Sequence, residues 1–287
     1  NMEGEGINAL LEMKEGLHLT KKQLEQEQVI LPKYHALYLD EELKEWQSVS
    51  AHKDKEFKAL IRNMKTVEDN DFEIPAKMEL ILREYQKRGF LWIKTLKYNG
   101  FGGILADDMG LGKTLQVIVF LLSEYLEEEG NSPSLIVAPA SLVFNWQSEI
   151  RKFAPDLPVQ MVVGKAGDRK SIIKHAGSRD ILVTSYDLLK RDIDLYENMT
   201  FSNQIIDEAQ YIKNHNTQAA KAVKMVNAGF KLALTGTPVE NRLSELWSIF
   251  DYLMPGFLYS YQRFREELEL PIAVSYTHLT LPTNSRV

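Results

Sequence analysis

The sequence contains no cysteine among its 287 residues. Disulfide bonds and cysteine-ligated zinc sites are therefore excluded, and we expect a cytoplasmic protein. The longest unbroken apolar run, Val117 to Leu122, is much shorter than the roughly 20 residues that span a bilayer. We therefore predict no membrane partner. The first ten residues also lack the basic stretch and the apolar core of a secretory signal.

The sequence also has no excess of positive charge. Its formal net charge is −6, which argues against a protein that binds nucleic acid through bulk charge alone. A local basic face on an acidic protein stays open. Hydrophobic residues make up 44% and charged residues 26% of the chain, as in soluble globular proteins with a substantial core. The length suits one large domain or two smaller ones.

Composition divides the chain into three segments. Residues 1–75 are rich in charge and poor in glycine, with helical patterns such as LDEELKEWQ and a possible helix cap at Thr20. We predict the helical end of an upstream region, followed by an acidic linker at residues 67–75 that ends in proline. Residues 76–272 alternate between strand and helix patterns. Residues 273–287 are rich in threonine and serine, and we expect either a natural linker or a translated sequencing adapter.

Six short apolar runs in the middle segment predict the strands of one sheet. They are GGILA, SLIVA, VQMVV, DILVT, QIID and KLALT. Strands of this length, separated by loops and helical patterns, are typical of a parallel sheet covered by helices on both faces. Such α/β sheets bind ligands at the carboxyl ends of their strands, and the motifs described next stand at those ends.

The stretch LADDMGLGKT, residues 105–114, ends as a phosphate-binding P-loop does. The first glycine of the pattern G-x-x-x-x-G-K-[ST] is replaced by Asp107. A predicted strand precedes the loop and a predicted helix follows it, so loop N–H groups and the helix N-terminus would face an anion. Gly110 and Gly112 would let the main chain approach phosphates, Lys113 would bind them and Thr114 would ligate magnesium. The alternative is a glycine-rich turn with a surface lysine.

A second motif, IIDEAQ, lies about 90 residues further along. Two isoleucines end a predicted strand and place Asp207 and Glu208 at its carboxyl end. Asp207 is suited to hold magnesium, and Glu208 to orient and deprotonate an attacking water. Paired carboxylates on a surface turn are common, so the order and context of the two motifs carry more weight than either motif alone.

Six sequence boxes in order resemble the Snf (sucrose non-fermenting) family of helicase-like ATPases in helicase superfamily two. The boxes are LREYQKRGFLW, DDMGLGKT, VAPASLVFNW, VTSYDLL, DEAQYIKN and LTGTPVENRLSELWSIFDYLMPG. The resemblance runs from about residue 73 to residue 272, and VILPKYHALYLDEEL resembles the end of the helicase-associated region of bacterial members. It implies a P-loop NTPase fold: a RecA-like lobe with a mainly parallel sheet, preceded by a helical segment.

The resemblance also implies roles for individual residues. The nucleotide, with magnesium, would contact Gln86, Gly110, Leu111, Gly112, Lys113 and Thr114. Asp207 would share the metal with Thr114, and the catalytic residues would be Lys113, Asp207 and Glu208. Gln86 could instead be a solvated helix position. Trp146 is predicted to be a packing residue rather than a base-stacking one.

Further boxes suggest contacts with double-stranded DNA and coupling to the nucleotide site. The expected DNA contacts are Ser141, Ser185, Tyr186, Lys213 and Asn214. Ser141 has an alternative as a helix cap. The expected coupling residues are Thr235, Gly236 and Thr237. Thr237, Pro238 and Glu240 also form the pattern of a capping box, which predicts a helix that starts at Thr237.

Together these features predict the first motor lobe of an ATPase that uses ATP and magnesium and moves along double-stranded DNA. Nothing after Met254 matches the motifs of the family's second lobe, which supplies an arginine finger worth roughly 10³ to 10⁵ in rate. The chain alone is therefore expected to be poorly active. Two alternatives stay open: another superfamily-two motor, such as an RNA helicase or a restriction translocase, and a non-catalytic DNA-binding or assembly module.

Overall fold

The structure is a computed structural model that describes residues 29, 31, 33, 35–36, 39–40, 43, 53–58, 61, 72–108, 110–127, 132–238 and 242–270. Within the N-terminal segment, residues 35–36, 39–40, 43, 55–58 and 61 are helical, as the sequence predicts. Three predictions fall outside the described residues: the helix cap at Thr20, the role of Glu240 in the capping box, and the tail 273–287.

The described part of the chain forms one sheet of six strands, in the order β1-β6-β5-β2-β4-β3. All neighbouring strands are parallel. Each of the six predicted apolar runs contributes a strand, so the expected α/β fold is confirmed. The strands are β1 (Gly103–Leu105), β2 (Ser134–Ala138), β3 (Val159–Met161), β4 (Ile181–Ser185), β5 (Thr200–Ile206) and β6 (Asn227–Leu234).

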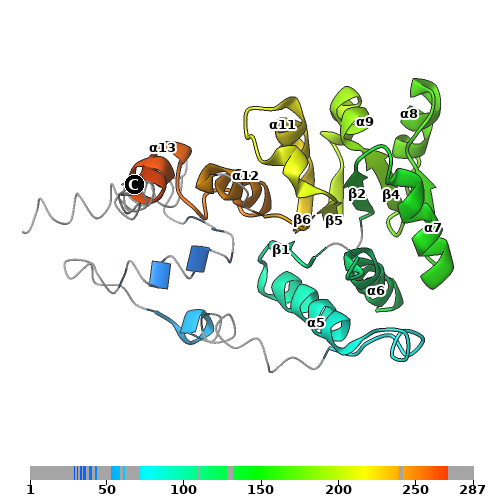
Figure 1. The fold of residues 1–287 in the computed structure, drawn as a ribbon, viewed down its shortest axis with the longest axis horizontal. Helices are drawn as coiled ribbons and strands as arrows, with labels where there is room; N and C mark the ends of the chain where they lie inside the picture. Colours follow the sequence, from blue (N-terminus) through cyan, green and yellow to red (C-terminus); the bar gives the residue numbers. More distant parts are fainter. Residues whose placement is uncertain are drawn as a thin grey trace, which may run out of the picture.

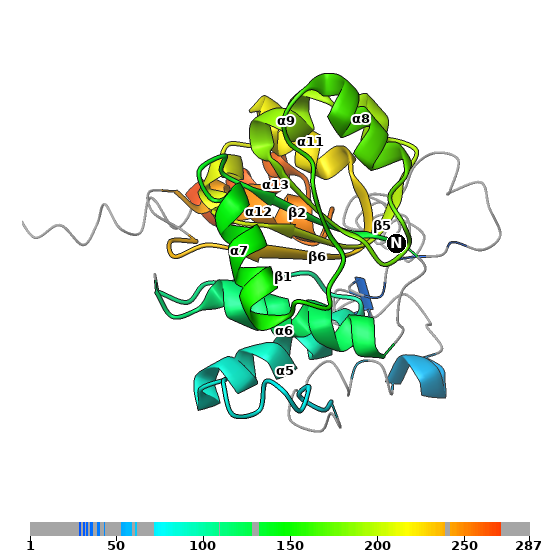
Figure 2. The same ribbon diagram turned by 90° about the vertical axis from the view of Figure 1, so that its right-hand side faces the viewer.

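Helices cover both faces of this sheet, and α5 and α6 lie on the opposite side from α9 and α11 in both views (Figures 1 and 2). The α-helices are α5 (Glu84–Asn99), α6 (Lys113–Leu126), α7 (Val143–Phe153), α8 (Ala166–Lys174), α9 (Tyr186–Arg191), α10 (Ile193–Tyr196), α11 (Gln218–Met225), α12 (Leu243–Leu253) and α13 (Tyr261–Phe264). The 3₁₀-helix η1 (Ala209–Ile212) and the π-helix η2 (Arg265–Glu269) complete the set.

Alternation along the strands builds two apolar layers from one sheet. In β2, Ile136 packs in the layer beneath α5, α6 and α7, whereas Leu135 and Val137 pack in the layer beneath α9, α11 and α12. Side chains of a strand point alternately to opposite faces, so a strand buried on both faces is apolar throughout. This is why SLIVA and DILVT form continuous apolar runs rather than alternating ones.

One predicted helix start is wrong. The TGTPVE pattern predicts a helix from Thr237, but α12 begins at Leu243, after Arg242 in extended conformation. The Thr235 hydroxyl instead accepts a hydrogen bond from the Thr237 N–H at 3.1 Å. Such a local side-chain bond competes with helix formation. Among the helices that the structure describes, none is both long enough and apolar enough to cross a membrane.

Candidate nucleotide-binding site

The predicted site lies at the carboxyl edge of the sheet, where the parallel strands all end. β1 leads into the P-loop, β6 into Thr235, β5 into Asp207, β2 into the Ser141 turn and β4 into Ser185. One strand, β6, separates the P-loop strand from the strand of the DEAQ box. A parallel sheet therefore gathers motifs that are up to about 120 residues apart in sequence at one edge.

The P-loop adopts a conformation that depends on glycine at two positions. Gly110 has φ 83° and Gly112 has φ 75°, a left-handed region that L-residues with side chains disfavour. A Cβ on Gly112 would come within 2.5 Å of the Gln86 amide nitrogen, whereas a Cβ on Gly110 would meet nothing within 4 Å. The loop therefore fits tightly against α5 at Gly112 and is open at Gly110, as a phosphate-binding loop requires.

Gln86 holds the P-loop from α5. It is buried rather than solvated, its amide donates to the Leu111 carbonyl at 3.1 Å, and its amide oxygen accepts from the Arg83 N–H at 3.0 Å. The Tyr85 hydroxyl donates to the same Leu111 carbonyl at 3.0 Å. The predicted contact of Gln86 with the nucleotide stays a prediction, and the structure adds a second role for Gln86, the positioning of Leu111.

Lys113 begins α6, as predicted. Its ammonium donates to the main-chain carbonyls of Asp107 at 2.6 Å and Asp108 at 3.1 Å. These carbonyls are neutral acceptors, and a phosphate oxygen would be a stronger partner for an ammonium. The Asp107 carboxylate accepts from the Gln116 amide of α6 at 2.9 Å. Asp107 thus ties the loop to the helix, which explains how an aspartate serves at the position of the missing glycine.

All three oxygens of Asp207 accept hydrogen bonds, and its N–H donates to the Val137 carbonyl at 2.8 Å. Its Oδ2 accepts from the indole Nε1 of Trp146 at 2.9 Å, and its Oδ1 accepts from the Glu208 N–H at 2.9 Å. Its main-chain oxygen accepts from the Tyr186 hydroxyl at 2.8 Å. Trp146 is 1% exposed, so the prediction that it packs in the core is confirmed, but its bond to Asp207 was not predicted.

Burial raises the pKa of Asp207 above its usual range. The Trp146 and Glu208 hydrogen bonds favour the ionised form and act in the opposite direction, as does the positive charge of Lys113. A carboxylate in this setting gains from a nearby cation, because the cation offsets the cost of desolvation. Asp207 is therefore electrostatically suited to a metal ion.

Glu208 occupies a strained position beside it. Its φ of 53° places a residue with a side chain in the left-handed region, a feature that clusters at functional sites. The Glu208 carboxylate accepts from the Gln210 amide at 2.7 Å, and the Gln210 amide oxygen accepts from the Thr235 hydroxyl at 3.4 Å. With the Thr237 N–H on the Thr235 hydroxyl, a chain of hydrogen bonds links Glu208 to the predicted coupling residues.

A magnesium ion fits the donors at this edge. The described residues contain no cluster of three or more His, Cys, Asp or Glu for a site built by protein alone. Magnesium usually takes only one or two protein ligands and keeps water and phosphates as the others. Thr114, in the first turn of α6, and Asp207, at the end of β5, are donors of that kind. They are the residues that would hold the ion.

The five predicted DNA contacts fall into two groups. Ser141 and Asn214 are exposed at the carboxyl edge, whereas Ser185 and Tyr186 are buried and Lys213 lies 3.3 Å from the Glu245 carboxylate of α12. The Ser185 hydroxyl accepts from the Leu188 N–H and caps α9. The alternative of Ser141 as a cap is wrong, since α7 has its N-cap at Leu142 without a side-chain bond.

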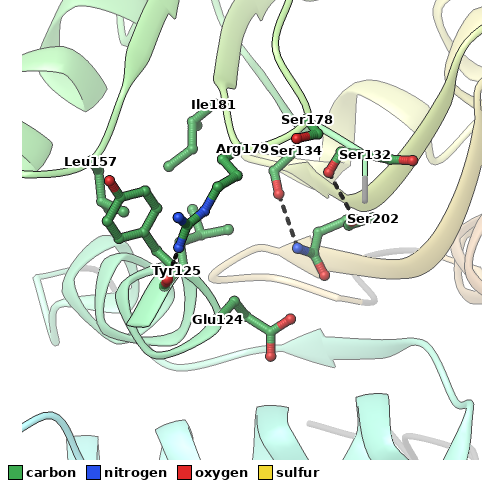
Figure 3. Close-up of a pocket in the computed structure, with 11 residues that line it drawn as sticks. Glu124, Tyr125, Ser132, Ser134, Leu157, Ser178, Arg179, Ile181 and Ser202 are labelled. Atoms are coloured by element: carbon green, nitrogen blue, oxygen red, sulfur yellow. Dashed lines mark hydrogen bonds between the residues drawn. The ribbon is translucent and has the colours of Figure 1, made fainter. Parts of the chain in front are cut away.

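A separate small pocket lies at the opposite, amino edge of the sheet (Figure 3). Two hydrogen bonds join groups that line it: the Asn203 amide donates to the Ser134 hydroxyl at 2.9 Å, and the Ser202 hydroxyl donates to the Ser132 carbonyl at 2.8 Å. The Arg179 guanidinium donates to the Tyr125 carbonyl and lies over the Tyr125 ring. We assign this pocket to the packing between α6 and the strands, because it is at the far end of the strands from the P-loop.

Comparison with known proteins agrees with this geometry. The model of the SNF2-related domain matches residues 85–284, and the model of the bacterial SNF2 helicase-associated region matches residues 1–75. The chain belongs to the SNF2-related family. The first match continues past residue 272, the predicted end of the lobe. The predicted domain bounds stay predictions.

Individual relatives and solved structures are similar to this SNF2-related chain. A protein of Mycoplasma pneumoniae named an uncharacterized ATP-dependent helicase is 42% identical over 78% of the chain and 22% of its own length. The TATA-binding protein-associated factor mot1 of Schizosaccharomyces pombe is 39% identical over 79% of the chain and 12% of its own length. The Sulfolobus solfataricus SWI2/SNF2 ATPase core in complex with dsDNA matches with a TM-score of 0.61 and 42% identity, over 67% of this chain and 40% of that chain.

Sequence reasoning missed the residues that act on the motifs from a distance. Trp146 is 61 positions from Asp207, and Tyr186 is 21 positions from it. No local pattern signals such a pair. The one available sign was position: Trp146 lies in the helix that follows the predicted strand SLIVA, and Tyr186 directly follows the strand DILVT.

Proposed function

We propose that the chain is the first motor lobe of a DNA-dependent ATPase that hydrolyses ATP to ADP and phosphate and moves along double-stranded DNA. The observation that supports this most is the arrangement of the P-loop and the DEAQ box at one carboxyl edge, where each of the three oxygens of Asp207 accepts a hydrogen bond. A surface turn with paired carboxylates would not need such support.

The residues divide the chemistry among them. The P-loop main chain and Lys113 would bind the β and γ phosphates, and Lys113 would leave the carbonyls of Asp107 and Asp108 to do so. Bound magnesium would neutralise charge that develops on the phosphates. Asp207 and Thr114 would hold that ion, and Glu208 would orient the attacking water and accept its proton.

The chain spans only 12% to 22% of the lengths of the two relatives described, and the proposal includes a second lobe in a longer protein. That lobe would supply the arginine finger, which is worth roughly 10³ to 10⁵ in rate. The chain alone would then bind ATP and hydrolyse it slowly. The DNA partner is supported by the neighbouring structure solved with dsDNA and by the exposed Ser141 and Asn214 beside the nucleotide site.

The test is ATP hydrolysis by the full-length protein with duplex DNA, with RNA and without nucleic acid. We expect stimulation by duplex DNA, and we expect Glu208→Gln to abolish turnover while ATP still binds. Stimulation by RNA alone would favour an RNA helicase. A Glu208→Gln variant with unchanged hydrolysis would favour a non-catalytic binding or assembly module.

A further inference from the structure

An exposed tyrosine lies directly after the DEAQ box. Tyr211 belongs to η1 and is 50% exposed. One face of its ring lies on the ring of Tyr186, with centroids 5.0 Å apart and planes 4° from parallel. This offset stack is a favourable arrangement of two aromatic rings. Tyr211 thus covers a buried tyrosine and exposes the rest of its own ring to solvent.

Tyr186 connects this stack to Asp207, the proposed magnesium ligand. It is 4% exposed, and its hydroxyl donates to the main-chain oxygen of Asp207. The Asp207 carboxylate is already held by Trp146 and by the Glu208 N–H, so the Tyr186 bond fixes the main chain behind it.

We propose that the stacked pair transmits nucleic-acid binding to the nucleotide site: Tyr211 receives a DNA strand, and Tyr186 is the positioning residue that fixes Asp207 in response. This inference rests on the proposed function and names the residues that regulate it. A tyrosine hydroxyl donates to phosphate oxygens, which every duplex offers regardless of its sequence. A motor that moves along DNA needs contacts of that kind.

The segment between the two sites is short and strained. Only Ala209 and Gln210 separate Glu208 from Tyr211, and Glu208 has its main chain in the left-handed region. A strand on the exposed side of Tyr211 would hold the ring between itself and Tyr186. That would favour the arrangement in which the Tyr186 hydroxyl meets Asp207. A ligand shifts such an equilibrium only if it binds one arrangement better. DNA would bind the stacked arrangement better, because Tyr186 supports one face of the Tyr211 ring while the other face is open to the strand.

The experiment measures ATP hydrolysis by the full-length protein as duplex DNA is titrated. It yields the maximal stimulation at saturating DNA and the DNA concentration for half of it. Tyr211→Phe keeps the stack and loses the hydroxyl, so it should need more DNA and reach the wild-type maximum. Tyr211→Ala and Tyr186→Phe break the connection, so each should lower the maximal stimulation about fivefold or more, the range of ordinary allosteric coupling.

Tyr98→Ala is the matched control, because Tyr98 is an exposed tyrosine of α5; it should match the wild type in both quantities. Wild-type maximal stimulation in Tyr211→Ala and Tyr186→Phe would overturn the inference and leave the proposed function intact. If Tyr211→Ala only raised the DNA requirement, Tyr211 would be a DNA contact without coupling, which also overturns it. A wild-type protein that duplex DNA does not stimulate would overturn both proposals.

Discussion

The hydrogen bond from Trp146 to Asp207 allows a prediction about magnesium. Trp146→Phe keeps an aromatic ring in the core and removes the N–H that donates to Oδ2 at 2.9 Å. A hydrogen bond to a charged group contributes about 1.5–3 kcal/mol, and about 1.4 kcal/mol corresponds to a tenfold change in affinity. Residues that orient a metal ligand typically contribute 10–100-fold to affinity. We therefore expect magnesium affinity to fall about 10- to 100-fold.

The assay is the binding of a fluorescent ATP analogue to the chain as magnesium is titrated. Trp247→Phe is the matched control. Trp247, on α12, is also a buried tryptophan, and its indole donates to the Tyr259 carbonyl at 3.3 Å. Both variants lose ring volume in a packed core, so both should lose stability, but only Trp146→Phe should lose magnesium affinity. Equal magnesium dependence in the folded Trp146→Phe variant and the wild type would refute the positioning role.

Three further changes test the loop, the titration and the packing. Gly112→Ala should destabilise the chain by at least about 1–2 kcal/mol in denaturant unfolding, because its φ of 75° disfavours a Cβ. Gly167→Ala in α8 is the control, since a Cβ there meets nothing within 4 Å. It should leave the stability of the chain unchanged or raise it by up to about 1 kcal/mol. Burial raises the pKa of Asp207, so protons should compete with magnesium at pH values above the ordinary aspartate pKa of about 3.9. As the pH falls towards that value, the wild type should lose magnesium affinity and the metal-free chain should gain stability. Asp207→Asn should lose both trends. Lys94→Met removes a buried partner of Glu124 at 2.9 Å, but Glu124 keeps its second partner, Lys97. The loss in denaturant unfolding should therefore stay below the about 3–5 kcal/mol expected when a buried charge loses its sole partner.

The sequence predicts well whatever depends on neighbours in the chain. The six strands and the start of α6 at Lys113 follow from local runs of apolar residues and from glycine positions. β6 is longer than the predicted apolar run KLALT. It begins at Asn227 and includes Gly229, and both residue types have low strand propensity. Pairing with β5 from Thr200 onwards extends it, and pairing partners are not visible in one strand's own sequence.

The motifs of the site could be predicted from the sequence, but the side chains that position those motifs could not. Lys113, Asp207 and Glu208 belong to patterns whose spacing has a chemical reason. The indole of Trp146 and the hydroxyl of Tyr186 reach Asp207 only after β2, β4 and β5 have come together in the sheet. The wrong helix start at Thr237 has the opposite cause, since a local capping pattern was overridden by another local bond, to the Thr235 hydroxyl.

Nucleotide binding by the chain itself tests the central claim most directly. Binding of ATP to the wild-type chain should depend on magnesium and should be lost in Lys113→Ala. It should be unchanged in Lys170→Ala, which removes an exposed lysine of α8. Retention of magnesium-dependent ATP binding in Lys113→Ala would contradict the assignment of the loop from Asp107 to Thr114 as a phosphate-binding site.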